Sequence, residues 1–398
     1  MLRSVEIQNF GSCARTSFDL DAPLSALCGR NGVGKTTVLN AIALLCSKTI
    51  TAYPIPTRSN FFLRRSVDIA GVSMTLGLEL DGVHYDYEFS APDFSDSARP
   101  VELTEFLTAG NGESRTSVFS RQGESVEALG RTDCIRIPKL TPGLAALISL
   151  LPRDDPASLH LERVRSFFAG VRYYTFEVDP PTESMISARA YEEWRDRHKA
   201  VGEPAPSLAM CLVYMQQEEP ELFDELQSIL GPEGIGVVEW IGVHDLGSII
   251  ANSEERWGDS KYFMPQVIPS RHMGGGANSF RLPELSVGTR RIIQIVTSML
   301  FDRRSLMLME QPEDSIHPGL LRKLIDLLRT YSGDTQMLFT THSAAVLDIL
   351  EPEEVLLATA VEGSTEVRRL TPDELVRAKD FLASEGTLSD FLEAQDEL

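Results

Sequence analysis

Eight consecutive residues constrain the fold of this chain more than any other feature. Gly29-Arg30-Asn31-Gly32-Val33-Gly34-Lys35-Thr36 matches the pattern G-x-x-x-x-G-K-[ST] at every fixed position. The apolar run at 24–28 predicts a strand before the loop, and apolar residues at helical spacing over 36–46 predict a helix that starts inside it. Strand, glycine loop and helix in this order indicate a site for nucleotide phosphates, because backbone N–H groups and the positive end of a helix face the loop.

The loop residues have distinct expected roles in binding ATP with Mg²⁺. Lys35 is expected to reach the β- and γ-phosphates, and the Thr36 hydroxyl to bind the metal ion. A chance glycine-rich turn is the alternative, and the predicted strand and helix on either side argue against it. The residues expected to contact the nucleotide are Gly29, Arg30, Asn31, Gly32, Val33, Gly34, Lys35, Thr36 and Thr37.

The rest of the chain divides into a β-rich start, a variable middle and an alternating end. We predict strands at 2–10, 16–20, 72–80 and 83–89, the last two joined by a turn at Asp81-Gly82 in an antiparallel sheet. Residues 90–117 look like a polar excursion, and the middle continues with helices within 140–168, a strand at 171–178, a helical insertion at 188–230 and strands at 237–243 and 262–268.

The last third alternates helices and strands, which is typical of a parallel sheet covered by helices. The predicted elements are helices at 292–301, 320–331 and 344–350 and strands at 305–309 and 336–340, followed by a hairpin within 355–370 and an acidic helical tail at 372–398. The nucleotide-binding core is therefore expected to be split between the two ends of an α/β chain, with the middle inserted.

Charge and hydropathy limit the partners and the location. The chain has 37 Lys and Arg against 58 Asp and Glu, a formal net charge of −21, so it repels a phosphate backbone overall, and binding nucleic acid would require a local basic groove. We expect a cytoplasmic protein without membrane contact, because no apolar run is long enough to span a bilayer. One basic segment, Arg58, Arg64 and Arg65 around Phe61-Phe62, is interpreted as a solvated loop in preference to a partner or nucleic-acid contact.

Three further segments follow the loop in a characteristic order. Leu285-Ser286-Val287-Gly288-Thr289-Arg290-Arg291 comes first, then an apolar run that ends in Glu310-Gln311-Pro312-Glu313-Asp314-Ser315-Ile316-His317-Pro318, then Thr340-Thr341-His342-Ser343. Together with the loop, they resemble the signature motif, Walker B with D-loop, and histidine switch of ABC-type ATPase heads. The resemblance is to AAA-family ATPases of the stand-alone RecF, SMC and OLD kind, including those of bacterial antiphage systems, and the four motifs lie within residues 1–90 and 280–350.

The resemblance implies a role for each motif residue. Ser286 and Gly288 would cap the γ-phosphate held by a second subunit, so that two chains complete each site. Glu310 would bind Mg²⁺ together with Thr36, and His342 would contact the γ-phosphate. The catalytic set it implies is Glu310, Gln311, Glu313 and His342.

Gln311 departs from the family pattern. ABC heads carry a glutamate at this position, and a glutamine can orient water but cannot accept its proton. We therefore expect slow hydrolysis unless Glu313 substitutes. A natural glutamine and a substitution that traps ATP both fit the sequence.

The resemblance also implies an architecture and a function. It predicts an ABC-ATPase-like head with a mixed or parallel core sheet, an antiparallel β-subdomain and a helical insertion, divided as 1–90, 91–270, 271–350 and 351–398. With only 48 residues after Leu350, too few for an OLD-type nuclease domain, we expect an ATP-dependent dimer or higher homo-oligomer that regulates a separate nuclease or toxin in antiphage defence. The alternative is a RecF-like DNA-maintenance ATPase that binds DNA; a transporter subunit fits less well.

Overall fold

The chain folds into two units, each built around its own sheets. The computed structural model describes residues 1–51, 71–91, 102–112, 114–176, 184–201, 205–246, 261–270, 278–302, 304–384 and 386–395. The first unit comprises Met1–Thr175, Arg304–Gln311 and Leu328–Leu398, and the second comprises Phe176–Arg303 and Pro312–Leu327. The basic segment with Arg58, Arg64 and Arg65 lies outside the described residues.

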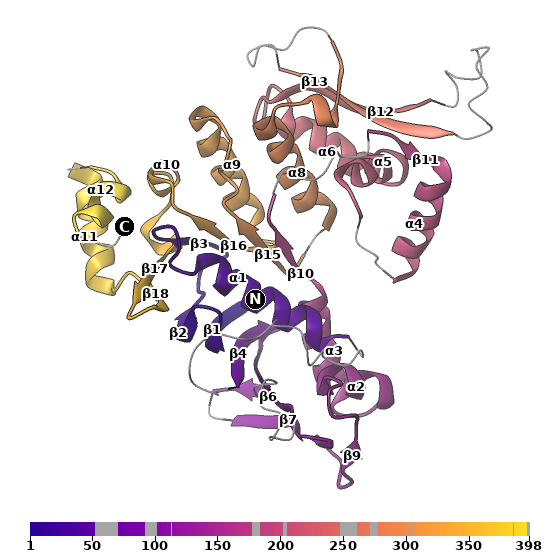
Figure 1. The fold of residues 1–398 in the computed structure, drawn as a ribbon, viewed down its shortest axis with the longest axis vertical. Helices are drawn as coiled ribbons and strands as arrows, with labels where there is room; N and C mark the ends of the chain where they lie inside the picture. Colours follow the sequence, from indigo (N-terminus) through magenta and orange to yellow (C-terminus); the bar gives the residue numbers. More distant parts are fainter. Residues whose placement is uncertain are drawn as a thin grey trace. The chain divides into compact units, whose positions relative to one another are not determined.

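The first unit contains the predicted parallel sheet. Its order is β10 (Val171–Tyr174), β15 (Leu306–Glu310), β16 (Gln336–Thr341), β3 (Leu24–Cys28), β17 (Val355–Val361) and β18 (Ser364–Arg369), seen side by side in Figure 1. All neighbours pair in parallel except β17 and β18, which form the predicted hairpin. Every residue of β3 is buried, which is typical of a parallel strand covered on both faces. The mixed sheet expected from the sequence is confirmed.

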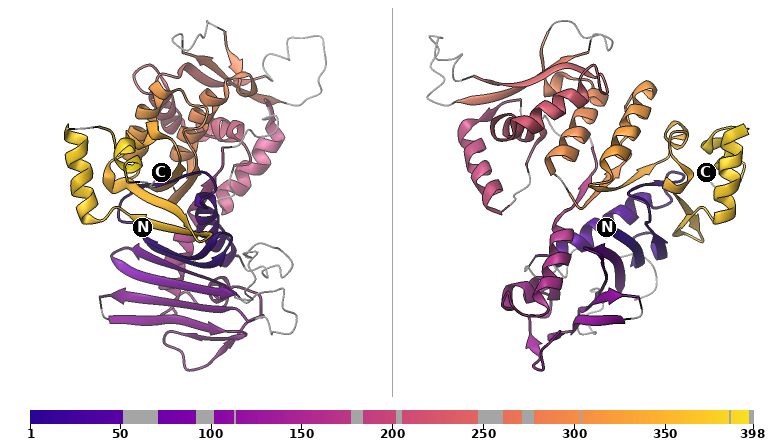
Figure 2. Two further views of the ribbon diagram at one scale, coloured as in Figure 1. Left: turned by 60° about the vertical axis from the view of Figure 1, so that its left-hand side comes forward. Right: turned by 180° about the vertical axis from the view of Figure 1, so that it is seen from behind.

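An antiparallel sheet of eight strands completes the β-structure of this unit (Figure 2, left). The turn at Asp81 and Gly82 has φ of 51° and 73°, as the tight hairpin predicted there requires. The strand order is β2 (Cys13–Asp19), β1 (Leu2–Phe10), β4 (Val72–Leu80), β5 (Val83–Ala91), β6 (Thr104–Asn111), β7 (Ser114–Gln122), β8 (Ser125–Ala128) and β9 (Ile135–Arg136).

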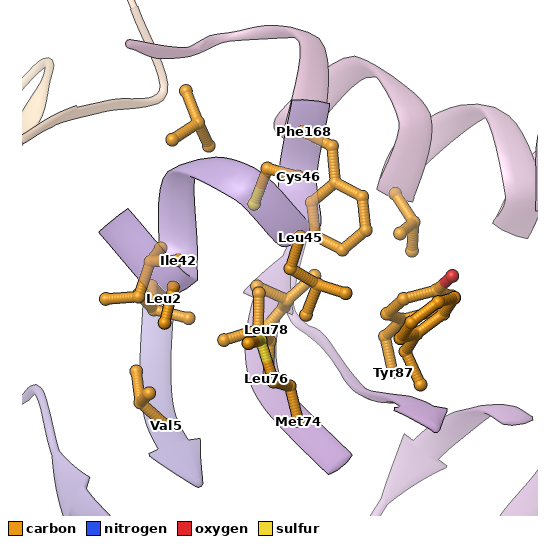
Figure 3. Packing of buried hydrophobic residues seen from close by; sticks show 14 of the residues in the cluster. Leu2, Val5, Ile42, Leu45, Cys46, Met74, Leu76, Leu78, Tyr87 and Phe168 are labelled. Carbon is orange, nitrogen blue, oxygen red and sulfur yellow. The ribbon is translucent and has the colours of Figure 1, made fainter. Parts of the chain in front are cut away.

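Helix α1 (Lys35–Thr49) packs into the core shared by these two sheets. Ile42, Leu45 and Cys46 are each 1% exposed and belong to one buried cluster with Leu2 of β1 and Leu76 of β4 (Figure 3). The same core includes apolar residues of β3, β15 and β16. Since the helix begins at the glycine loop, this packing fixes the direction in which its N-terminus points.

The prediction of a polar excursion over 90–117 is wrong for the described part of that range, whereas 92–101 and 113 lie outside the described residues. Strand β6 and the first four residues of strand β7, both in the antiparallel sheet, lie in this segment. The usual alternation is inverted at one step, because the acidic Glu105 is fully buried whereas Phe106 is 38% exposed. An inward acid beside an outward aromatic residue conceals the period-two pattern that identifies a strand.

Glu105 is buried because it belongs to a hydrogen-bonded network. Arg121 of β7 donates to Glu105 at 2.6 Å and to the Thr141 carbonyl at 2.5 Å, and both side chains of this ion pair are 0% exposed. Tyr87 donates to Glu105 at 2.8 Å, and burial together with that carboxylate raises the pKa of Tyr87 well above its usual value. Glu105 also accepts from the Gly143 N–H at 2.7 Å, at the start of α2 (Gly143–Leu150).

Arg121→Ala should therefore lower the free energy of unfolding by about 3–5 kcal/mol, because it leaves a buried carboxylate without its cation. Urea titration followed by circular dichroism measures the change. The matched control is Arg115→Ala on the same strand, whose ion pair with Asp86 is half exposed and should contribute little. Equal losses in the two variants would contradict this assignment.

The second unit is mainly helical and contains the predicted insertion. Its small sheet has the order β11 (Ile186–Ser187), β13 (Tyr262–Pro269) and β12 (Val238–Asp245), with β14 (Phe280–Arg281) paired to β13. The helices are α4 (Ala188–Val201), α5 (Leu208–Glu218), α6 (Pro220–Leu230), α8 (Val287–Asp302) and the start of α9 (Pro318–Tyr331). A short 3-10 helix, η2 (Leu282–Glu284), precedes α8.

The remaining helices belong to the first unit. They are α3 (Ser158–Ala169), α10 (Ala344–Leu347), the 3-10 helix η3 (Pro352–Glu354), α11 (Pro372–Ser384) and α12 (Leu388–Glu393). Helix α10 is shorter than the 344–350 predicted, and it ends at Leu347. Within the described ranges, no helix is both long and apolar enough to cross a membrane.

Candidate functional site

The glycine loop connects β3 to α1 and takes a backbone path that needs glycine. Gly29, Gly32 and Gly34 have φ of 155°, 84° and 100°, in a region that residues with a side chain rarely occupy. A Cβ at Gly29 would also lie 2.2 Å from the Ala358 carbonyl oxygen of β17. No side chain caps α1, so its first turn retains the N–H groups that suit an anion.

Lys35 is held across this loop. Its side chain is almost covered, at 6% exposed, and Nζ donates to the carbonyl oxygens of Gly29 at 2.6 Å and Arg30 at 2.9 Å. The ammonium group is therefore fixed beside the loop, whereas Thr36 is exposed at the first turn of the helix. A fixed cation beside exposed N–H donors is suited to a polyphosphate.

Glu310 ends the buried strand β15 at the same sheet edge. In the parallel register, Glu310 pairs with Thr340 of β16, and Thr341 pairs with Cys28 at the end of β3. Glu310 Oε1 is buried and has no hydrogen-bond partner among the described residues. A buried carboxylate oxygen without a donor fits a metal ligand, and with the Thr36 hydroxyl it offers Mg²⁺ the oxygen donors it prefers.

Gln311 and His342 meet just beyond these strand ends. Gln311 adopts a left-handed backbone with φ of 40°, and its N–H donates to the Thr340 carbonyl at 3.1 Å. Its side-chain amide donates from Nε2 to His342 Nδ1 at 2.8 Å. Because an amide NH₂ only donates, Nδ1 accepts, and the neutral imidazole carries its proton on Nε2. His342 is thereby oriented as a donor to an oxygen.

One pocket adjoins the loop, and a second lies along the helix that follows it. One, of about 490 Å³, is lined by Gly29, Arg30 and Asn31 together with His342 and, from α12, Glu393. The other, of about 600 Å³, follows α1 from Thr37 to Ser47 and is bounded by Phe10 of β1 and Tyr173 of β10. Aromatic and apolar walls beside a phosphate site suit a nucleobase.

The remaining predicted residues lie in the second unit. Ser286 caps α8, accepting from the Thr289 N–H at 3.2 Å, so the signature segment starts a helix as the resemblance implies. A Cβ at Gly288 would lie 2.2 Å from the Ser315 carbonyl oxygen, which explains the glycine. Glu313 is 7% exposed in this unit, whereas Gln311 belongs to the first. The structure thus brings together the loop, Glu310, Gln311 and His342, and holds Ser286, Gly288 and Glu313 on the other unit.

Two family models match parts of the chain. One, described as an AAA domain, matches residues 4–125, which contain the glycine loop. The other, described as an AAA domain, putative AbiEii toxin, Type IV TA system, matches residues 246–348, which contain Ser286, Glu310 and His342. A comparison with curated protein sequences gives no match.

Solved structures of SMC heads share the fold. An SmcHead bound to the C-winged helix domain of ScpA is 12% identical with a TM-score of 0.56, and covers 94% of this chain and 99% of its own. An Smc head domain with an extended coiled coil, bound to the C-terminal domain of ScpA derived from Pyrococcus furiosus, is 10% identical with a TM-score of 0.50, covering 96% and 99%.

The chain has the fold of an ABC-type, SMC-like ATPase head.

In this head, the loop also has contacts to residues outside the four motifs. Thr365 of β18 donates from Oγ1 to the carbonyl oxygen of Val33 at 2.8 Å, and Ser12 lies 2.6 Å from the same hydroxyl. Neither residue belongs to a motif, and they are separated by 353 positions in the sequence. No local signal marks either residue, because the contact exists only once β18 lies beside the β1–β2 turn.

Proposed function

We propose that this head is an ATP-dependent switch that dimerises around ATP, hydrolyses it slowly and regulates a separate effector in antiphage defence. The observation that carries the proposal is the contact between Gln311 and His342 beside the glycine loop. In the proposed ATP-bound state these two groups would lie beside the γ-phosphate, and neither is a carboxylate that could take a proton from water. Such a site is suited to binding ATP for a long time and hydrolysing it slowly.

The comparisons support the kind of system proposed. The model that matches the second half of the site is described as a putative AbiEii toxin of a Type IV TA system. The two SMC heads are described as bound to domains of ScpA, so a head of this fold can carry a protein partner. We extend the binding of a partner to this chain as part of the proposal, and we take the toxin–antitoxin description as support for a toxin or nuclease as that partner.

Dimerisation can be tested at the signature helix. Val287, the first residue of α8, is 38% exposed. Val287→Asp should leave ATP binding intact but abolish the shift from monomer to dimer with ATP and Mg²⁺, because its charge would repel the γ-phosphate of the second subunit. Aspartate in the first turn favours the helix, so folding should be preserved. Light scattering measures the mass, and equilibrium dialysis measures the binding.

The matched control is Val376→Asp, which puts the same charge at a 60% exposed valine of α11. It should dimerise like the unmodified protein. An unmodified protein that binds ATP and keeps its mass would exclude the ATP-gated homodimer. Salt-sensitive binding of a DNA duplex, stronger with ATP, would instead favour the RecF-like function.

A further inference from the structure

The hairpin of β17 and β18 contacts the backbone of the glycine loop. Thr365 of β18 is 1% exposed, and its hydroxyl donates to the Val33 carbonyl at 2.8 Å. A Cβ on Gly34 would lie 2.0 Å from Thr365 Oγ1 and 2.2 Å from Ser12 Oγ. The two hydroxyls therefore occupy the space beside the loop, and Gly34 is needed for their close approach as well as for its positive φ.

The hydrogen bonds in this group have a defined direction. A threonine hydroxyl has one proton, and Thr365 gives it to the Val33 carbonyl, which only accepts. The 2.6 Å contact between Ser12 and Thr365 must then run from the Ser12 hydroxyl to Thr365 Oγ1. The result is a relay from Ser12 through Thr365 to the backbone of the loop.

The backbone of Thr365 is fixed as well. Its N–H donates to the Ser12 carbonyl at 2.9 Å, and its carbonyl accepts from the Thr16 hydroxyl at 2.6 Å. The hydroxyl that reaches the loop is therefore positioned by the β1–β2 hairpin on one side and by β18 itself on the other. Little freedom remains for it to turn away from Val33.

The relay determines where one loop N–H points. In a trans peptide, the carbonyl of one residue and the N–H of the next lie on opposite sides of the bond. The Val33 carbonyl points towards Thr365, so the Gly34 N–H points away from the hairpin. A hydrogen bond to the carbonyl also strengthens that N–H as a donor. Backbone N–H groups of such loops hold the α- and β-phosphates.

We infer that Thr365, supported by Ser12, is a positioning residue for the nucleotide: it orients the Gly34 N–H for the β-phosphate. The inference rests on the proposed nucleotide site. It assigns a binding role to a hairpin that contains none of the recognised motifs.

The test is nucleotide affinity in variants of the full chain, measured by isothermal titration with MgATP and MgADP. Thr365→Val keeps the side-chain volume and removes the hydroxyl. It should weaken the binding of both nucleotides about tenfold, because the Gly34 N–H binds the β-phosphate, which ATP and ADP both contain. Thr365→Ser restores the donor and should bind within about twofold of the unmodified protein. Ser364→Ala is the control, since Ser364 accepts from the Ala14 N–H at 3.1 Å and does not reach the loop.

The outcomes separate the inference from the proposed function. Absence of ATP binding by the unmodified protein overturns both. A folded Thr365→Val variant with unchanged affinity overturns the inference alone, as does an equal loss in Thr365→Ser. Should Thr365→Val fail to fold, Ser12→Ala removes the first donor of the relay and should weaken the binding of both nucleotides about threefold. Unchanged affinity in Ser12→Ala would overturn the inference.

Discussion

Lys35→Ala should raise the dissociation constant of ATP by about 100-fold to 1,000-fold. Lys35 Nζ lies between two loop carbonyls and is 6% exposed, so its ammonium group is already in place beside the phosphate site. Hydrogen bonds to charged groups contribute about 1.5–3 kcal/mol each, and two such contacts to phosphate oxygens near the lower end of that range, about 3–4 kcal/mol together, account for the expected loss. Isothermal titration with MgATP measures the change, and ATP-dependent dimerisation should disappear with it.

Lys48→Ala is the matched control for this variant. Lys48 lies in the last turn of the same helix, about 20 Å from Lys35 at 1.5 Å per residue. It removes the same charge far from the loop, and ATP affinity should not change. Retained affinity in Lys35→Ala, or equal losses in both variants, would show that the glycine loop is not the phosphate site.

Gln311→Glu should increase the rate of ATP hydrolysis by about 100-fold to 10,000-fold, the range that a positioned general base contributes. The substitution keeps the size and shape of the side chain, and only the ability to accept a proton is gained. Phosphate release under single-turnover conditions measures the rate. A faster rate should shorten the lifetime of the ATP-dependent dimer, because the ligand that holds it together is consumed.

Glu313→Gln in the otherwise unmodified protein distinguishes the two candidate bases. If Gln311 leaves the site without a base, this variant retains the slow basal rate. If Glu313 substitutes, the basal rate is lost, and Gln311→Glu has little effect. The two measurements together identify the base, whichever result is obtained.

Local sequence was sufficient to predict the elements whose sequence patterns consist of neighbouring residues. The strand at 24–28, the loop with its three left-handed glycines and the helix that follows depend on neighbouring residues, so their pattern survives in the sequence. The same is true of the hairpin at Asp81-Gly82 and of the apolar strand that ends in Glu310. These elements correctly predicted the α/β class and the parallel core.

Residues that depend on distant partners could not be found this way. Glu105 can be buried because Arg121 and the N–H of Gly143 at the start of α2 bind its carboxylate. The local sequence does not show these partners, so it indicates a polar loop in this segment. The contact of Gln311 with His342 needs the ends of β15 and β16 to be adjacent, and the relay from Ser12 to Thr365 joins opposite ends of the chain. Sequence alone determined which residues form strand, loop and helix, because those preferences are local. Only the tertiary structure decided which side chains meet, because hydrogen bonds between distant segments form when the packing of the core brings the strands together.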